Sequence, residues 1–158
     1  MDDIRIAIVG YGGMGGNHGN YLWNEPVKGA RLSAICDIRP ERLDAAKKAY
    51  GDDMPTFASI DELIAAKAAD AVLIATPHYA HPPLAIKAFE AGLHVLSEKP
   101  AGVYAKQVRE MNEAAAKSGK VFGIMYNQRS WPVNRKIKEL IDAGELGEIQ
   151  QYGNCVCC

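Results

Sequence analysis

The chain has 158 residues, of which 48% are hydrophobic and 23% are charged, and its 18 basic and 19 acidic side chains give a formal net charge of −1. The length is that of one domain with part of another. The share of hydrophobic residues is high enough to form a core, unlike that of a disordered chain. The near-neutral balance, with no basic run, argues against nucleic acid and membrane surfaces as partners.

The first ten residues, MDDIRIAIVG, lead directly into an apolar run. Two aspartates stand where a secretory leader would carry lysine or arginine. The longest wholly apolar runs, such as AVLIA at 71–75, are far shorter than the roughly 20 residues that span a bilayer. We therefore expect a cytoplasmic protein.

Apolar, β-rich runs alternate along the chain with longer stretches rich in Ala, Lys and Glu. The expected strands are 5–9, 32–36, 71–75, 94–96 and 121–125. The expected helices are 14–23, 40–50, 60–66, 82–91, 105–117 and 133–143. Apolar strands that alternate with helices form a parallel sheet covered on both faces, so the sequence predicts a doubly wound α/β domain.

Several of these helices carry signals at their ends. Ser59, followed by Glu62, has the spacing of a capping box. Gly92 and Gly119 each follow a helical stretch, where a residue in the left-handed conformation is favoured.

The carboxyl end breaks the alternation. GELGEIQQYGNCVCC begins a strand-like stretch at 149–157, and a single strand has no partner with which to bond. We expect a complete domain in 1–125, and in 126–158 a connecting helix and the first strand of an incomplete second α/β domain. Cys155, Cys157 and Cys158 could hold a metal or form disulfides, but no histidine or second cysteine pair lies nearby, so we predict no metal site.

A glycine loop follows the first expected strand directly. In a G-x-G-x-x-G loop the first glycine permits a tight turn, the second lets the main chain approach a pyrophosphate, and the third lets the helix pack on the strand. The helix that follows points its amino terminus at the phosphates. The loop therefore predicts a dinucleotide site made by Gly10, Tyr11, Gly12, Gly13, Met14 and Gly15.

Asp37 ends the second expected strand, about 20 residues after the loop, where an acidic residue binds the adenosine ribose. Its carboxylate would accept both ribose hydroxyls and repel a 2′-phosphate, which favours NAD. Arg39 is the counter-signal for NADP, because a guanidinium there can contact that phosphate or stack on adenine. The alternative role of Asp37 is to cap the helix that begins at Pro40.

Two other protein classes use glycine-rich loops. A P-loop is excluded, because no Gly-Lys-Ser/Thr follows the glycines. A methyltransferase also combines a glycine loop with an acidic residue, and it stays open as an alternative at this point.

Two later stretches are more specific. ATPHYAHPPLAIKAFEAGLHVLSEKP, at 75–100, has a strand ending in Ala-Thr-Pro, then a histidine, a helix and a strand ending in Glu-Lys-Pro. GIMYNQRSWPVNRKIKELIDAGELGEI, at 123–149, continues with a helix and a Gly-Glu-Ile ending. Together with the glycine loop they resemble the Gfo/Idh/MocA family of oxidoreductases along essentially the whole chain. The resemblance implies a Rossmann domain followed by a substrate domain.

Ligands of open α/β sheets bind outside the carboxyl ends of the strands. Thr76, Pro77 and His78 follow one such end, so we expect them to border the nicotinamide ribose and the pyrophosphate. His81 lies nearby at the head of a helix, where it is either part of the site or a surface residue.

Glu98 and Lys99 follow the next strand end. The resemblance implies that Lys99 contacts both cofactor and substrate, where its ammonium would stabilise the negative charge on oxygen during hydride movement. Glu98 would hydrogen-bond the cofactor. The alternative for Lys99 is an exposed lysine at a strand end.

In the block at 123–149, the resemblance implies two further cofactor ligands, Asn127 and Arg129. The alternative is that both are solvated loop residues. Ser130 departs from the aromatic residue usual in the family, and Trp131 follows it.

The resemblance thus implies an NAD(P)-dependent oxidoreductase that acts on a sugar, an inositol or a similar polyol or ketone. We expect the second domain to supply most of the substrate pocket, the general acid–base and a homo-oligomer interface, so this chain alone should be inactive. The alternative function is a dinucleotide-binding module without catalysis, acting as a sensor or scaffold.

Overall fold

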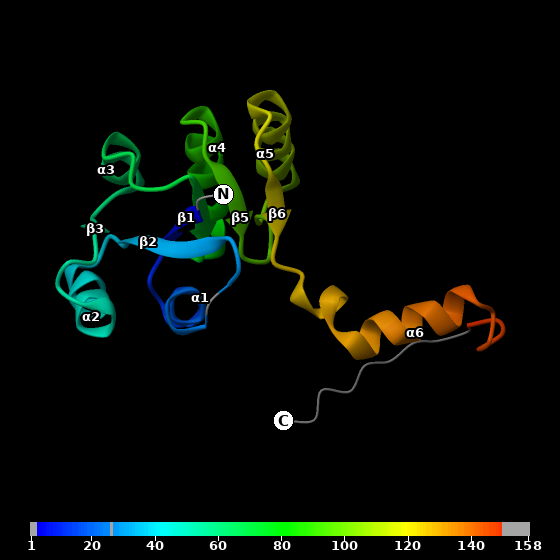
Figure 1. Cartoon of the computed structure of the whole chain (residues 1–158). Coiled ribbons are helices and arrows are strands. Elements are labelled where there is room, and N and C mark those ends of the chain that lie inside the picture. Colours follow the sequence, from blue (N-terminus) through cyan, green and yellow to red (C-terminus); the bar gives the residue numbers. More distant parts are fainter. Residues whose placement is uncertain (1–2, 26, 150–158) are drawn as a thin grey trace. The chain divides into compact units, whose positions relative to one another are not determined.

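The computed structural model describes residues 3–25 and 27–149. Along the chain its elements are β1 (Ile4–Val9), α1 (Gly13–Asn24), β2 (Ala30–Cys36), α2 (Pro40–Tyr50), β3 (Thr56–Phe57), α3 (Ile60–Ala65), β4 (Ala71–Ile74), η1 (His78–Ala80), α4 (His81–Glu90), β5 (His94–Ser97), α5 (Ala105–Ser118), β6 (Phe122–Ile124), η2 (Asn127–Ser130) and α6 (Pro132–Asp142) (Figure 1).

The six strands form one sheet in the order β3-β2-β1-β4-β5-β6, and all neighbouring pairs are parallel. The chain begins in the middle of the sheet, builds outward to β3, and then crosses to β4 on the other side of β1. This reversal is the topological switch point of a doubly wound sheet, next to which ligands bind. The predicted fold class is confirmed.

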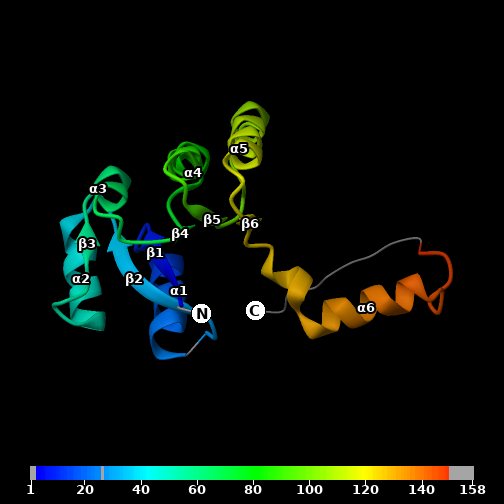
Figure 2. The ribbon, with the colours of Figure 1, turned by 45° about the horizontal axis from the view of Figure 1, so that its top comes forward.

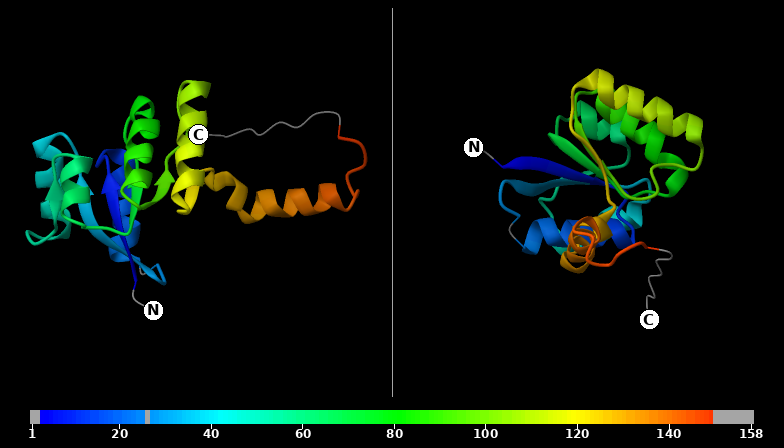
Figure 3. Two further views of the ribbon diagram at one scale, coloured as in Figure 1. Left: turned by 90° about the horizontal axis from the view of Figure 1, so that it is seen from above. Right: turned by 90° about the vertical axis from the view of Figure 1, so that its right-hand side faces the viewer.

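Helices cover both faces of the sheet, with α1 and α2 on one face and α3, α4 and α5 on the other (Figures 1 and 2). Side chains of β1 alternate between the two layers: Ala7 and Val9 join the core under α3 to α5, whereas Ile8 joins the core under α1 and α2. Helices α4 and α5 lie side by side (Figure 3). The strands are therefore buried on both faces, which explains their nearly continuous apolar runs.

Each predicted helix is present within a residue or two of its expected bounds. The capping box forms at α3, where the Glu62 main-chain N–H donates to Ser59 Oγ at 3.2 Å. Gly92 and Gly119 have φ of 78° and 65°, the left-handed conformation expected of them. Strand β3 was not predicted, because its two residues are too few to form a period.

Residues Tyr126–Cys158 form a second compact unit. Its described part consists of η2 and α6, which are joined by a hydrogen bond from Asn134 Nδ2 to the Gln128 carbonyl at 2.7 Å. No residue of α6 is buried. The predicted strand at 149–157 and the three terminal cysteines lie, apart from Ile149, outside the described residues. Within residues 3–25 and 27–149, no helix has the length and apolar character that a membrane span requires.

Candidate cofactor site

The glycine loop packs tightly against the ends of β1 and β4. Gly10 has a φ of 93°, and a Cβ there would lie 2.8 Å from the Ala75 carbonyl carbon and the Thr76 nitrogen. A Cβ on Gly15 would lie 1.9 Å from the Gly10 carbonyl oxygen. Both positions therefore require glycine, because the atoms in the way belong to the main chain.

The start of α1 is open. A Cβ on Gly12 or Gly13 would meet nothing within 4 Å, so the main chain there is accessible. Within the part of the chain that the structure describes, no side chain caps α1, and its first turn has no acidic residue. The partial positive charge of the helix end is therefore left for an anionic ligand.

The Asp37 carboxylate lies beside this loop and is only 8% exposed. It accepts hydrogen bonds from the main-chain N–H groups of Tyr11 at 2.8 Å and Arg39 at 2.9 Å. Arg39 is the N-cap residue of α2 and Asp37 does not bond to the helix, so the capping alternative is not supported. The Arg39 guanidinium lies 3.8 Å from the same carboxylate. The two residues predicted to discriminate between NAD and NADP are therefore neighbours.

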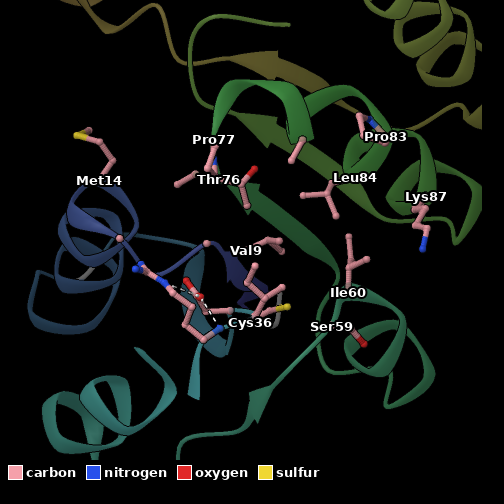
Figure 4. A pocket seen from close by; sticks show the side chains of 17 residues that line it. Val9, Met14, Cys36, Ser59, Ile60, Thr76, Pro77, Pro83, Leu84 and Lys87 are labelled. Atoms are coloured by element: carbon pink, nitrogen blue, oxygen red, sulfur yellow. Dashed lines mark hydrogen bonds and ion pairs between the residues drawn. The ribbon is translucent and has the colours of Figure 1, made fainter. Parts of the chain in front are cut away.

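A pocket of about 860 Å³ opens between the strand ends, α3 and α4. Figure 4 shows Met14 and Lys87 toward opposite ends of it, with Thr76 and Pro77 on one side. Its inner wall includes Val9, Cys36, Ile60 and Leu84, an apolar surface suited to a flat ring. Burial raises the pKa of the Cys36 thiol to about 12, so this cysteine is an inert part of the wall.

Thr76 closes the pocket near the glycine loop. Its Oγ1 is buried and has no hydrogen-bond partner among the described residues. Buried polar atoms are nearly always bonded, so this hydroxyl fits a polar group of a ligand. The open α1 terminus, the Asp37 carboxylate, the apolar pocket and this hydroxyl together fit the phosphates, ribose and adenine of a dinucleotide.

His81 stands behind this edge. Its side chain is fully buried, and its Nδ1 and Nε2 lie 2.8 Å from the carbonyl oxygens of Pro100 and Thr76 respectively. A carbonyl oxygen only accepts, so a ring nitrogen that carries a proton donates to the carbonyl it faces. His81 thus ties together the loops after β4 and β5 and offers no free polar atom to a cofactor.

Glu98 continues β5 beyond its last paired residue. Its side chain is buried, and its Oε1 lies 2.7 Å from Nε2 of His18 in α1. Its Oε2 accepts from the Lys99 main-chain N–H at 3.1 Å. The Lys99 side chain is exposed, and the peptide bond to Pro100 is cis.

The structure brings most of the predicted residues to one edge of the sheet. Those that line the pocket are Gly10, Gly12, Met14, Asp37, Arg39, Thr76 and Pro77. Those of the same unit outside that lining are Tyr11, Gly13, Gly15, His78, His81, Glu98 and Lys99. Asn127 and Arg129 are exposed residues of η2 in the second unit.

The sequence reasoning missed His18. The signal available was a histidine in the second turn of the helix that follows the glycine loop. Its partner Glu98 is 80 residues away, so no local spacing could have paired them. Residues 3–25 and 27–149 contain no cluster of three or more His, Cys, Asp or Glu side chains suited to a metal ion.

The reversal of strand order, the glycine loop and the buried carboxylate define a dinucleotide-binding α/β domain. Residues 4–126 match the Gfo/Idh/MocA model, described as an oxidoreductase family with an NAD-binding Rossmann fold, and the chain belongs to this family. The resemblance stated from the sequence is confirmed, and the methyltransferase alternative is excluded.

Curated relatives match this chain along most of its length. The chain is 36% identical to inositol 2-dehydrogenase of Corynebacterium glutamicum, over 92% of the chain and 43% of that protein. It is 31% identical to D-glucoside 3-dehydrogenase of Escherichia coli, over 92% of the chain and 41% of that protein. The crystal structure of scyllo-inositol dehydrogenase from Lactobacillus casei, with bound NAD(H) and scyllo-inositol, superimposes with a TM-score of 0.86 at 30% identity, covering 93% of the chain and 43% of that protein. The chain thus spans less than half the length of these relatives.

Proposed function

We propose that the chain is the cofactor-binding part of an NAD-dependent dehydrogenase that moves a hydride between nicotinamide and a secondary alcohol or ketone of a cyclic polyol or sugar. The observation that carries the proposal is the buried Asp37 carboxylate, which lies at the pocket beside the uncapped start of α1. That carboxylate would accept the ribose hydroxyls and repel a 2′-phosphate, so NAD is preferred over NADP.

When bound, NAD accepts the hydride and NADH donates it. The main-chain N–H groups at the start of α1 would hold the phosphates, and Thr76 Oγ1 would bond a polar group near them. Asn127 and Arg129 are proposed to add contacts from the second unit.

Lys99 is the proposed catalytic residue of this chain. Its ammonium has no acidic partner among the described residues and follows the carboxyl end of β5. A positive charge beside the reacting oxygen would stabilise the negative charge that develops there. The proton of that oxygen requires a general acid–base, which speeds such steps roughly 10²–10⁴-fold. We place this group in a substrate domain that begins within 126–158, after a cofactor domain in 1–125.

The substrate class follows from the relatives, whose names specify inositols and a glucoside. Rings with several adjacent secondary hydroxyls are the shared chemistry. Homo-oligomeric assembly and a cytoplasmic location stay predictions from the sequence.

The cofactor proposal is tested by titrating the chain with NADH and NADPH and following nicotinamide fluorescence. NADH should bind more tightly. Asp37→Asn removes a charge-assisted hydrogen bond, so it should weaken NADH binding roughly tenfold and narrow its advantage over NADPH. An unchanged preference in Asp37→Asn would show that this carboxylate does not select the cofactor.

The catalytic proposal is tested with the native-length protein, NAD and an inositol. Lys99→Ala should reduce turnover by about 10²-fold or more while NADH binding is retained. The alternative, a binding module without catalysis, predicts no turnover in the unaltered protein with any polyol or sugar.

A further inference from the structure

The contact between His18 and Glu98 joins two parts of the site that the sequence keeps far apart. His18 belongs to α1, whose first residues are proposed to hold the phosphates. Glu98 follows β5, at the end proposed for nicotinamide. The Nε2 of His18 lies 2.7 Å from Glu98 Oε1, and the two side chains are only 15% and 7% exposed.

The second carboxylate oxygen of Glu98 is also engaged. Oε2 accepts from the Lys99 main-chain N–H at 3.1 Å, and the Glu98 main-chain N–H donates to the Ile74 carbonyl at 2.8 Å. The Glu98 main chain is thus held by the β4–β5 ladder, whereas its carboxylate is held between His18 and the Lys99 main chain. The orientation of this carboxylate therefore depends on His18.

A contribution to the free energy of unfolding does not by itself explain the contact between His18 and Glu98. Desolvation of a buried charge offsets much of the attraction to its partner, so a buried pair often adds little to the free energy of unfolding. A buried polar contact does fix geometry, because few other orientations satisfy both groups. A fixed carboxylate and lysine main chain are what a hydride-transfer site needs at this strand end.

We propose that His18 is a positioning residue, which orients the Glu98 carboxylate and through it the Lys99 main chain, and so couples the phosphate-binding helix to the nicotinamide end of the site. The inference rests on the proposed function, because that proposal assigns the phosphates to the start of α1 and the nicotinamide to the end of β5. It predicts that His18 matters for the nicotinamide half of the ligand and not for the ADP half.

The test compares two ligands, NADH and ADP-ribose, which lacks nicotinamide. His18→Ala should weaken NADH binding roughly tenfold, because a Glu98 carboxylate that His18 no longer orients would lose its charge-assisted hydrogen bond to the cofactor, and it should leave ADP-ribose binding unchanged. His94→Ala is the matched control, because His94 begins β5 at the opposite end of the same strand. It should change neither affinity.

A second pair of variants keeps the test decisive if His18→Ala does not fold. The amide nitrogen of Gln reaches about as far as histidine Nε2, whereas that of Asn reaches only as far as Nδ1. His18→Gln should therefore retain NADH affinity, and His18→Asn should lose it. A double-mutant cycle with Glu98→Ala should show that His18→Ala has no further effect once Glu98 is gone.

The outcomes separate the two proposals. If the unaltered chain binds neither ligand, the proposed function fails and this inference fails with it. If it binds both and His18→Ala weakens both equally, His18 supports the helix only and the positioning role is overturned. Unchanged NADH affinity in a folded His18→Ala or His18→Asn variant also overturns it.

Discussion

The two ends of the parallel strands differ in how deeply their paired charged groups are buried. At the amino edge Arg5 and Asp70 form a pair with an Nη2–Oδ1 distance of 2.8 Å, and their side chains are 36% and 44% exposed. At the carboxyl edge lie all the polar or charged residues that are buried in the described chain, namely Asp37, His81, Ser97 and Glu98. The same strands β1, β4 and β5 contribute to both edges.

This difference indicates which edge is built for binding. A pair in partial contact with water has little desolvation cost and little effect beyond its own neighbourhood. Buried polar groups are costly unless their partners are held in place, and such groups concentrate at functional sites. Changes at the carboxyl edge should therefore alter ligand binding, and changes at the amino edge should alter only stability.

The largest effect is expected in the glycine loop. Gly15→Ala places a Cβ 1.9 Å from the Gly10 carbonyl oxygen, so the helix must move away from the strand. We expect a loss of about 3 kcal/mol in the free energy of unfolding, typical of overpacking against the main chain, together with loss of NADH binding. Urea unfolding and NADH titration measure the two effects.

Gly16→Ala is the matched control for Gly15→Ala. The two glycines are neighbours in α1, but a Cβ on Gly16 meets nothing within 4 Å. Because alanine is the better helix former, Gly16→Ala should raise the free energy of unfolding by roughly 0.5–1 kcal/mol. Equal destabilisation by both substitutions would contradict the packing argument.

A smaller effect is expected for His81. His81→Leu puts an apolar side chain of similar size in place of the ring that faces the Thr76 and Pro100 carbonyls, so the polar contact between the two loops is lost. The expected loss is about 2 kcal/mol in the free energy of unfolding, with weaker NADH binding because both loops border the site. Chemical denaturation and NADH titration again give the two values.

The same substitution at the amino end of β5 serves as the control. His94 Nδ1 accepts from the Val121 main-chain N–H at 2.9 Å, in an exposed setting where water can replace it. His94→Leu should change the free energy of unfolding by no more than about 0.5 kcal/mol and leave NADH affinity unchanged. An effect on NADH as large as that of His81→Leu would remove the distinction between the two edges.

How far the sequence predicts this molecule depends on the range of the signal. The apolar runs, the capping pair Ser59 and Glu62, and the glycines are local patterns, and each appears where expected. The position of Asp37 was predictable because the distance between the glycine loop and the second strand end is set by the fold.

Contacts between distant segments had no such signal. His18 and Glu98 meet through a single side-chain contact between α1 and the residue after β5, and nothing near either residue in the sequence predicts the other. His81 was predicted as part of the cofactor site or as a surface residue, and the structure buries it instead. Its burial follows from the two carbonyls that converge on it from different loops.

A small effect that depends on pH is expected for the Arg5–Asp70 pair at the amino edge. Hydrogen bonds from Arg5 lower the pKa of Asp70 from 3.8 to about 2. The contribution of the ionised Asp70 to the free energy of unfolding is therefore fully present above about pH 4 and is lost as the pH falls toward 2. Because both side chains are over a third exposed, solvent screening keeps this contribution to the free energy of unfolding small. Asp70→Asn should flatten the dependence of the free energy of unfolding on pH in this acid range and leave NADH affinity at pH 7 unchanged.

If the acid dependence persists in Asp70→Asn, other carboxylates cause it. A loss of NADH affinity in this variant would show that the two edges are coupled.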